Sequence, residues 1–286
     1  MNLKVNKPQI GSIRISGDDS LNFLQGQLTQ DLGGLSENSP LMSGWANSKG
    51  RLLCVTFLIS WKKSIWMILP ESIQESVANR LKMYVLRSKV KIDIANSNIT
   101  ISNKEPEFSS SKYCFEKENK IFFRTKIGTG LCLDLNHQQT LEENKSLDDW
   151  RLANIEAGIP SVWPTTTETF VPQMLNLDLL GAISFEKGCY VGQEIVARTQ
   201  NLGRIKRRMY RFICSTSQDA YPGDKIYLDG KESGEIVDAI RVPATKNIEL
   251  LAVIPINQSK EKFHLDSSGE TELKNGNLPY EVPSAV

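Results

Sequence analysis

The sequence predicts an α+β protein whose C-terminal part is a small β-barrel. Before residue 203, apolar residues recur both with helical spacing and in short runs that are typical of buried strands. After Gly203 the helical spacing disappears, and short apolar segments alternate with turn signals such as Asp229-Gly230, a pair favoured in tight hairpins. With 286 residues the chain has the length of about two domains and enough residues for a sizeable core.

The first 95 residues alternate between predicted strands and helices. Strands are expected at 13–15, 51–61, 64–69 and 89–94. Asp18 is suited to cap a helix, because the leucines after it have helical spacing: Leu21, Leu24, Leu28 and Leu32. A second helix is predicted after Pro70, with one apolar face formed by Ile73, Val77, Leu81 and Val85.

The rest of the chain divides into a polar stretch, a helix and the β-rich end. Residues 96–111 are expected to form an exposed loop or a weak edge hairpin, and a helix at 148–157 is ended by Gly158 and Pro160. Short extended segments follow at 204–213, 225–228, 249–256 and 263–265. Their length and number predict the barrel.

Composition narrows the classes of function. Hydrophobic residues make up 40% and charged residues 23% of the chain, which is typical of globular proteins. The formal net charge of +1 argues against a dedicated nucleic-acid binder, which normally has a basic excess. The longest apolar stretch, residues 52–59, is too short to cross a membrane, and the N-terminus lacks a signal-peptide pattern. We therefore expect a cytoplasmic protein with no membrane partner.

The cysteines give no pattern of a metal site. The chain has 5 cysteines, widely dispersed, and 2 histidines, His137 and His264, with no CxxC pair. A structural zinc site or a permanent four-cysteine cluster needs closer ligand spacing. We expect reduced thiols and no bound metal.

One cysteine lies in an unusual setting. In the stretch KGCYVGQE (187–194), two glycines flank Cys189, and a helical turn is expected from about residue 195. Lys187 and Arg198 are close enough in sequence to favour the thiolate. A buried, inert cysteine is the alternative, but the glycines and Lys187 favour a functional thiol. Nucleophilic catalysis of the protease kind is not indicated, because neither histidine lies in a motif.

The same stretch resembles the signature of the YgfZ-type proteins, which are relatives of the folate-dependent aminomethyltransferase (T-protein) of glycine cleavage. Other segments fit this family in the same order, from the first predicted helix to the end of the chain. They are FLQGQLTQD (23–31), NSKGR (47–51), EAGIP (156–160), FVPQ (170–173), NLD (176–178) and LPY (278–280). The resemblance thus covers nearly the whole chain.

The resemblance implies a three-module aminomethyltransferase-like fold around a central opening that holds tetrahydrofolate or a folate derivative. The modules would be 1–46 with 118–202 as a discontinuous first module, 47–117 as an inserted α+β module, and 203–286 as the barrel. Cys189 and Lys187 would then be the catalytic candidates beside the opening.

Folate itself suggests which residues contact it. A pterin needs flat apolar walls and a carboxylate for its N–H edge, and its glutamate tail needs cations. Glu194 is the candidate for the pterin edge, with a helix-start carboxylate as the equal alternative. The other candidate contacts are the walls Tyr190 and Trp45, the amide Gln193, and the cations Arg198 and Arg204. The alternative for Trp45 is that it belongs to the hydrophobic core.

Three functions are open at this point. The first is a folate-binding accessory protein for the assembly or repair of iron–sulfur proteins. Its partners would be the assembly machinery or client enzymes, and its effect on tRNA modification would be indirect. The second is an aminomethyltransferase, but the T-protein has an acidic residue soon after the turn matching Gly50, and RLLCVT (51–56) has none. The third is direct tRNA binding through the basic run 195–218, which we instead interpret as a solvated strand face: Lys206 and Arg208 on one side, Arg207 and Arg211 on the other.

Overall fold

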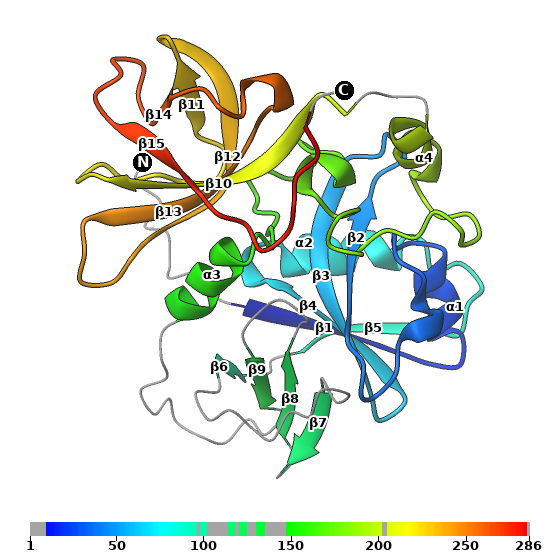
Figure 1. Cartoon of the computed structure of the whole chain (residues 1–286). Helices are drawn as coiled ribbons and strands as arrows, with labels where there is room; N and C mark the ends of the chain where they lie inside the picture. The colour runs from blue at the N-terminus through cyan, green and yellow to red at the C-terminus, as the bar shows by residue number, and fades with distance from the viewer. Residues whose placement is uncertain are drawn as a thin grey trace.

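The computed structural model describes residues 10–95, 98–101, 114–117, 120–124, 130–134, 147–201 and 205–284. These residues form two open antiparallel sheets, several helices and a closed barrel, arranged as Figure 1 shows. No helix within the described ranges has both the length and the apolar character needed to cross a membrane. The mixed architecture with a C-terminal barrel confirms the predicted fold class.

The first sheet has the strand order β2-β3-β4-β1-β5. Its strands are β1 (Ile10–Ser16), β2 (Leu41–Ala46), β3 (Leu52–Trp61), β4 (Ser64–Pro70) and β5 (Lys91–Ala95). All residues of β4, and those of β3 up to residue 59, are buried. Burial on both faces explains why these two strands are continuous apolar runs in the sequence.

Two helices accompany this sheet, and both are shorter than predicted. In α2 (Glu71–Lys82) the expected apolar face is confirmed for Ile73, Val77 and Leu81, which are buried, whereas Val85 lies beyond the end of the helix. The first helix, α1 (Ser20–Gln25), is much shorter than the leucine spacing predicted, and its N-cap residue is Asp19. It ends before Gly26, a residue of low helix propensity.

The second sheet lies below the first in Figure 1 and has the order β6-β9-β8-β7. Its strands are β6 (Asn98–Ile101), β7 (Cys114–Lys117), β8 (Lys120–Arg124) and β9 (Gly130–Asp134). Ile121 and Phe123 belong to the same core cluster as Phe57 of the first sheet and Trp150 of helix α3 (Leu147–Glu156). A separate core thus joins the two sheets and α3.

Two of the predicted module borders fall between strands that pair with each other. A border at 46/47 divides β2 from β3, which are antiparallel neighbours. A border at 117/118 divides β7 from β8, which form another antiparallel pair. The first sheet is complete within residues 10–95, so the chain changes sheet between β5 and β6. Hydrophobic patterns do not reveal which strands pair, so the sequence alone did not show this change of sheet. The module borders themselves stay a prediction.

The C-terminal part is a closed barrel of strand order β10-β13-β12-β11-β14-β15. The strands are β10 (Arg207–Ser215), β11 (Lys225–Leu228), β12 (Lys231–Arg241), β13 (Asn247–Pro255), β14 (Phe263–His264) and β15 (Glu272–Gly276). The predicted hairpin at Asp229-Gly230 is confirmed, with φ of 51° and 75° at the two residues. Phe212 and Phe263 pack edge to face, 5.9 Å apart, in its core.

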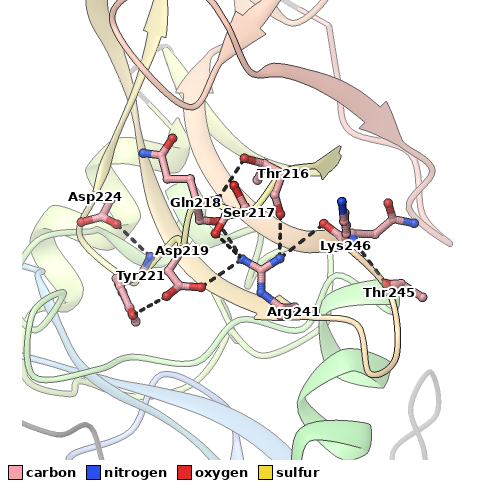
Figure 2. Close-up of polar contacts among 10 residues, drawn as sticks. Thr216, Ser217, Gln218, Asp219, Tyr221, Asp224, Arg241, Thr245 and Lys246 are labelled. Carbon is pink, nitrogen blue, oxygen red and sulfur yellow. Dashed lines mark hydrogen bonds and ion pairs between the residues drawn. The ribbon is translucent and has the colours of Figure 1, made fainter.

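One arginine organises the long connection between β10 and β11. Figure 2 shows the Arg241 guanidinium among backbone carbonyl oxygens, donating to Thr216 at 2.7 Å and to Gln218 at 2.8 Å. It also binds the carboxylate of Asp219 at 2.9 Å. Because a guanidinium has five N–H donors, one side chain closes this whole loop onto the end of β12.

A buried ion pair joins the barrel to the rest of the chain. Arg208 of β10 is 4% exposed, and it binds both carboxylate oxygens of Asp178 at 2.8 Å. Arg211 binds Glu249 in the same two-pronged way, at 2.9 and 3.1 Å. The interpretation of Arg208 and Arg211 as a solvated face is therefore wrong. Their carboxylate partners lie 30 and 38 residues away in sequence, beyond the reach of a local pattern.

The C-terminal segment fastens the same junction. The hydroxyl of Tyr280 donates to the carbonyl of Gly158 at 2.8 Å and accepts from the Asn176 amide at 3.3 Å. A Cβ on Gly158 would meet the Tyr280 oxygen at 2.5 Å, so glycine is required there. Asn176 also donates to the backbone of Met209 in β10. The segments EAGIP, NLD and LPY therefore meet at one structural junction.

We predict that the Arg208–Asp178 pair is essential for stability. Asp178→Asn leaves the buried guanidinium without a charge partner and is expected to lower the unfolding free energy by about 3–5 kcal/mol. Asp93→Asn is the control, because its pair with Lys91 lies at the surface and is expected to contribute less than about 1 kcal/mol. Urea denaturation measures both. Equal losses in the two variants would contradict the assigned role.

Candidate functional site

The segment that carries Cys189 lies against the turn that follows α1. It connects to α4 (Gln193–Asn201), and two backbone hydrogen bonds attach it to the earlier chain. The Ser184 amide donates to the Thr29 carbonyl at 2.9 Å, and the Val191 amide donates to the Gly26 carbonyl at 3.3 Å. We call residues 184–192 the cysteine loop. Two segments 160 residues apart thereby form one site.

A lysine side chain supplies the strongest connection. The ammonium of Lys187 donates to the carbonyl oxygens of Gln25 at 2.7 Å, Leu28 at 2.9 Å and Gln30 at 2.9 Å. An ammonium has three N–H donors, so all of them are used. The same nitrogen lies 5.2 Å from the ring centre of Tyr190, within the range of a cation–π contact. Burial lowers the pKa of Lys187 to about 8, so the charged form still predominates at neutral pH.

These contacts change the expected role of Lys187. The sequence suggested that it favours the Cys189 thiolate, but its three donors are taken by backbone carbonyls on another segment. Within the part of the chain that the structure describes, no hydrogen bond or ion pair connects the two side chains. The geometry therefore assigns Lys187 to holding the loop in place.

A glycine contact fixes the other end of the cysteine loop. Gly192 has a φ of 83°, and a Cβ on it would lie 2.4 Å from the Asn47 carbonyl oxygen and 3.3 Å from the Gly50 Cα. Gly50 has a φ of 68° and packs against Ile195. Gly188 is different, because a Cβ there would meet no atom within 4 Å. Of the two glycines beside the cysteine, only Gly192 is required by packing.

Cys189 itself lies at the surface. It is exposed, and it makes no hydrogen bond to any described residue. Cys54, Cys114 and Cys214 are all buried, and burial raises the pKa of Cys54 to about 12. Among these four cysteines, only Cys189 is presented to a reagent or a partner.

The described residues hold no group of three or more histidine, cysteine, aspartate or glutamate side chains placed to bind a metal ion. His264 lies in the barrel strand β14, and the other histidine lies outside the described residues.

The candidate folate contacts divide into an exposed group and a buried group. Glu194 and Arg198 are exposed and lie four residues apart on α4, hence on one face of the helix. Gln193 begins α4 and donates to the Lys187 carbonyl at 3.5 Å. Arg204 lies outside the described residues.

The proposed aromatic walls belong to the buried group. Trp45 is 0% exposed and packs edge to face against Tyr84, with ring centres 6.2 Å apart. Tyr190 is 7% exposed, and burial raises its pKa to about 12. Neither ring presents a face to a ligand in this conformation, so the expectation of stacking walls has no support here. Trp45 is instead a residue of the hydrophobic core, the alternative considered from the sequence.

The structure also brings an acidic residue to the turn at 47–50 that the sequence did not indicate. The Glu168 amide donates to the Leu52 carbonyl at 2.8 Å, and its carboxylate accepts from Arg80 at 2.5 Å. Hydrogen bonds from Arg80 and Asn47, with the charge of Lys49, hold the pKa of Glu168 below its usual range. Its φ of 59° is uncommon for a residue with a side chain, and no sequence signal marks it.

Comparison with known proteins identifies the fold. The structure is similar to the crystal structure of the glycine cleavage system aminomethyltransferase T from Bartonella henselae, with a TM-score of 0.70. The match covers 96% of this chain and 85% of that protein at 14% sequence identity, which shows the fold alone. The chain thus has the aminomethyltransferase fold, as the sequence predicted.

Sequence comparison then gives the family. The chain is 30% identical to the tRNA-modifying protein YgfZ of Colwellia psychrerythraea, over 79% of this chain and 75% of that protein. It is 32% identical to the tRNA-modifying protein YgfZ of Hamiltonella defensa, over 70% and 66%, and 30% identical to an uncharacterized protein of Haemophilus influenzae, over 97% and 98%. No protein-family model matches the chain. The chain belongs to the YgfZ family.

We predict that Lys187 and Cys189 differ in their effect on stability. Lys187→Met leaves three backbone carbonyls without their donor and is expected to cost about 2–4 kcal/mol of unfolding free energy. Cys189→Ser changes an exposed side chain and is expected to stay within about 0.5 kcal/mol of the wild type. Chemical denaturation measures both variants. If Lys187→Met is as stable as Cys189→Ser, the ammonium does not hold the loop.

Proposed function

We propose that this protein binds tetrahydrofolate or a folate derivative and supports the assembly or repair of iron–sulfur proteins. On this proposal its effect on tRNA modification is indirect, through tRNA-modifying enzymes that contain iron–sulfur clusters. The observation that carries the proposal is the exposed thiol of Cys189 on a loop fixed at both ends. Its place is the cytoplasm, and its partners are the assembly machinery or the client enzymes.

The chemistry of a fixed, exposed thiol supports this role. A thiolate is both a nucleophile and a soft metal ligand, so it is suited to contact iron, sulfide or another thiol. The buried cysteines are not accessible for such chemistry. Anchoring by Lys187 and Gly192 lowers the entropy lost when a partner engages the loop.

Folate binding has partial support from the side chains. Glu194 supplies a carboxylate for the N–H edge of a pterin, and Arg198 supplies a cation for the glutamate tail. Both are exposed on one face of α4, directly after the cysteine loop. The fold similarity to an aminomethyltransferase is consistent with this class of ligand. Trp45 and Tyr190, the aromatic residues predicted to form the walls of such a site, are buried, so we do not assign the wall to them.

The aminomethyltransferase alternative has one observation in its favour. Glu168 places a carboxylate beside the turn at 47–50, where the segment 51–56 has no acid. That carboxylate, however, is bound by Arg80 and has a lowered pKa, so it is unsuited to exchange a proton near neutral pH. We therefore favour the accessory protein over the enzyme.

The direct tRNA-binding alternative is weakened by the arginine contacts. In the basic run, Arg208 and Arg211 are committed to carboxylates, and Arg207 donates to the Ser233 carbonyl. Phosphate binding depends on cations that are free to neutralise it. Among the cations of the run that the structure describes, Lys206 and Arg198 are exposed, and two cations make a weak footprint for tRNA. The name of the YgfZ relatives fits an indirect link to tRNA modification equally well.

We predict that Glu194 contributes to folate affinity. Glu194→Gln is expected to raise the Kd for tetrahydrofolate about tenfold, because charge-assisted hydrogen bonds contribute about 1.5–3 kcal/mol. Glu186→Gln is the control, since Glu186 is also exposed but lies on the cysteine loop before Cys189, not on α4. Isothermal titration calorimetry of both variants under anaerobic conditions measures the difference. An unchanged Kd in Glu194→Gln, or an equal change in Glu186→Gln, would remove Glu194 from the site.

A second prediction separates the thiol from the folate site. Cys189→Ser is expected to bind tetrahydrofolate with a Kd within twofold of the wild type. In cells that lack the natural protein, it is expected to restore less than about a tenth of the activity of a cluster-containing tRNA-modifying enzyme, because serine is a poor substitute for a thiolate. Full complementation by Cys189→Ser would refute the proposed function of the thiol. Aminomethyl transfer from a lipoyl carrier by the wild-type protein would establish the enzyme instead.

A further inference from the structure

The loop that follows α2 exposes an unusual number of apolar side chains. Leu86 is 86% exposed, Met83 68% and Tyr84 37%, and Leu21 of α1 is 44% exposed. Isolated exposed apolar residues are common on proteins, whereas a group of them marks an interaction site. Methionine and aromatic residues are also enriched where proteins bind one another.

These side chains belong to one surface because the loop is attached to α1. The Lys89 amide donates to the Asp19 carboxylate at 2.7 Å, and the Asp19 amide donates to the Lys89 carbonyl at 3.4 Å. A Cβ on Gly17 would meet the Lys89 carbonyl at 2.1 Å, so the two segments touch backbone to backbone. Figure 1 shows this loop beside α1, to the right of the first sheet, with α4 above them.

The loop, together with the end of α2 and the start of β5 that border it, is strongly basic. Residues 80–91 contain five cations and no acid: Arg80, Lys82, Arg87, Lys89 and Lys91. Arg80 pairs with Glu168 and Lys91 with Asp93, while Lys89 is 4.0 Å from Asp18, both largely exposed. Lys82 and Arg87 have no ion-pair partner among the described residues, and both are exposed. Two uncompensated cations therefore lie next in sequence to the exposed Met83 and Leu86.

This surface is close to the exposed thiol. Asp19, at the N-terminal end of α1, contacts the basic loop, and Gln25, at its C-terminal end, accepts from Lys187 of the cysteine loop. A helix of six residues is about 9 Å long. A partner that covers the loop therefore reaches the cysteine loop across the length of α1.

We propose that this surface, defined by Leu21, Met83, Tyr84 and Leu86 with Lys82 and Arg87, binds a protein whose face carries apolar side chains flanked by aspartate and glutamate. A protein is favoured over a nucleic acid because Leu86 and Met83, the most exposed members, gain by burial against apolar groups and have nothing to offer a phosphate. Lys82 and Arg87 steer the acidic rim into register. Only the further identification of this partner as an iron–sulfur client of Cys189 rests on the proposed function.

The first test identifies the occupant with the full chain in living cells. A photo-crosslinking amino acid replaces Leu86, and in a matched control it replaces Tyr221, a 51% exposed aromatic residue of the barrel. We expect one protein to be crosslinked from position 86 and not from 221, through a peptide that contains apolar and acidic residues. Crosslinking to RNA, to a second copy of this chain or to nothing would each overturn the proposal.

The second test measures the interaction with the purified partner. Leu86→Asp is expected to weaken binding at least tenfold and Arg87→Glu at least fivefold, while Tyr221→Asp leaves the Kd unchanged. Higher salt is expected to reduce the difference between wild type and Arg87→Glu, since exposed charges are screened. Equal affinity of wild type and Leu86→Asp would refute the surface. Tetrahydrofolate titration of the wild type is a separate readout: a wild-type protein that binds the partner but no folate contradicts the proposed function and leaves the surface standing.

Discussion

The site depends on one buried cation. The ammonium of Lys187 lies among three backbone carbonyls, and a charge removed from water is tolerated only when each of its donors is satisfied. The segment 25–30 must therefore turn so that three carbonyl oxygens point to one position, and Gly26 lies within that turn. The cysteine loop, in turn, has several exposed residues and few apolar anchors. Each segment thus requires the other, which explains why FLQGQLTQD and KGCYVGQE occur in one chain.

The remaining motifs extend this constraint through the molecule. Gly192 packs on the Asn47 carbonyl, and the Asn47 side chain accepts from the amides of Lys49 and Arg51, which closes the turn at 47–50. At the junction with the barrel, Asn176 and Tyr280 connect strand β10 to the turn that follows α3. These contacts are structural. The Gly192 contact fixes the end of the cysteine loop next to α4, whereas the Cys189 thiol is exposed and makes no hydrogen bond to a described residue.

The sequence predicted what depends on local pattern. The apolar face of α2, the hairpin at 229–230 and the barrel all follow from periodicity and turn residues. The sequence could not predict partners that lie far apart along the chain. Arg208 was interpreted as solvated because its partner Asp178 lies 30 residues away. Lys187 was assigned to the thiol because its partner Gln25 lies 162 residues away. Glu168 was missed for the same reason, and the basic apolar loop at 80–91 was missed because its residues continue the pattern of a helix.

A fixed thiol, two charged residues on α4 and an apolar–basic surface across α1 are the observations behind our proposal that the protein presents a cysteine to a partner. The claim beneath this description is that the Lys187 ammonium holds the cysteine loop. Hydrogen–deuterium exchange of wild type and Lys187→Met tests it directly. We expect the amides of Ser184 and Val191 to exchange at least tenfold faster in the variant, with β10 and β13 unchanged. Equal protection of both amides in the two proteins would contradict the account.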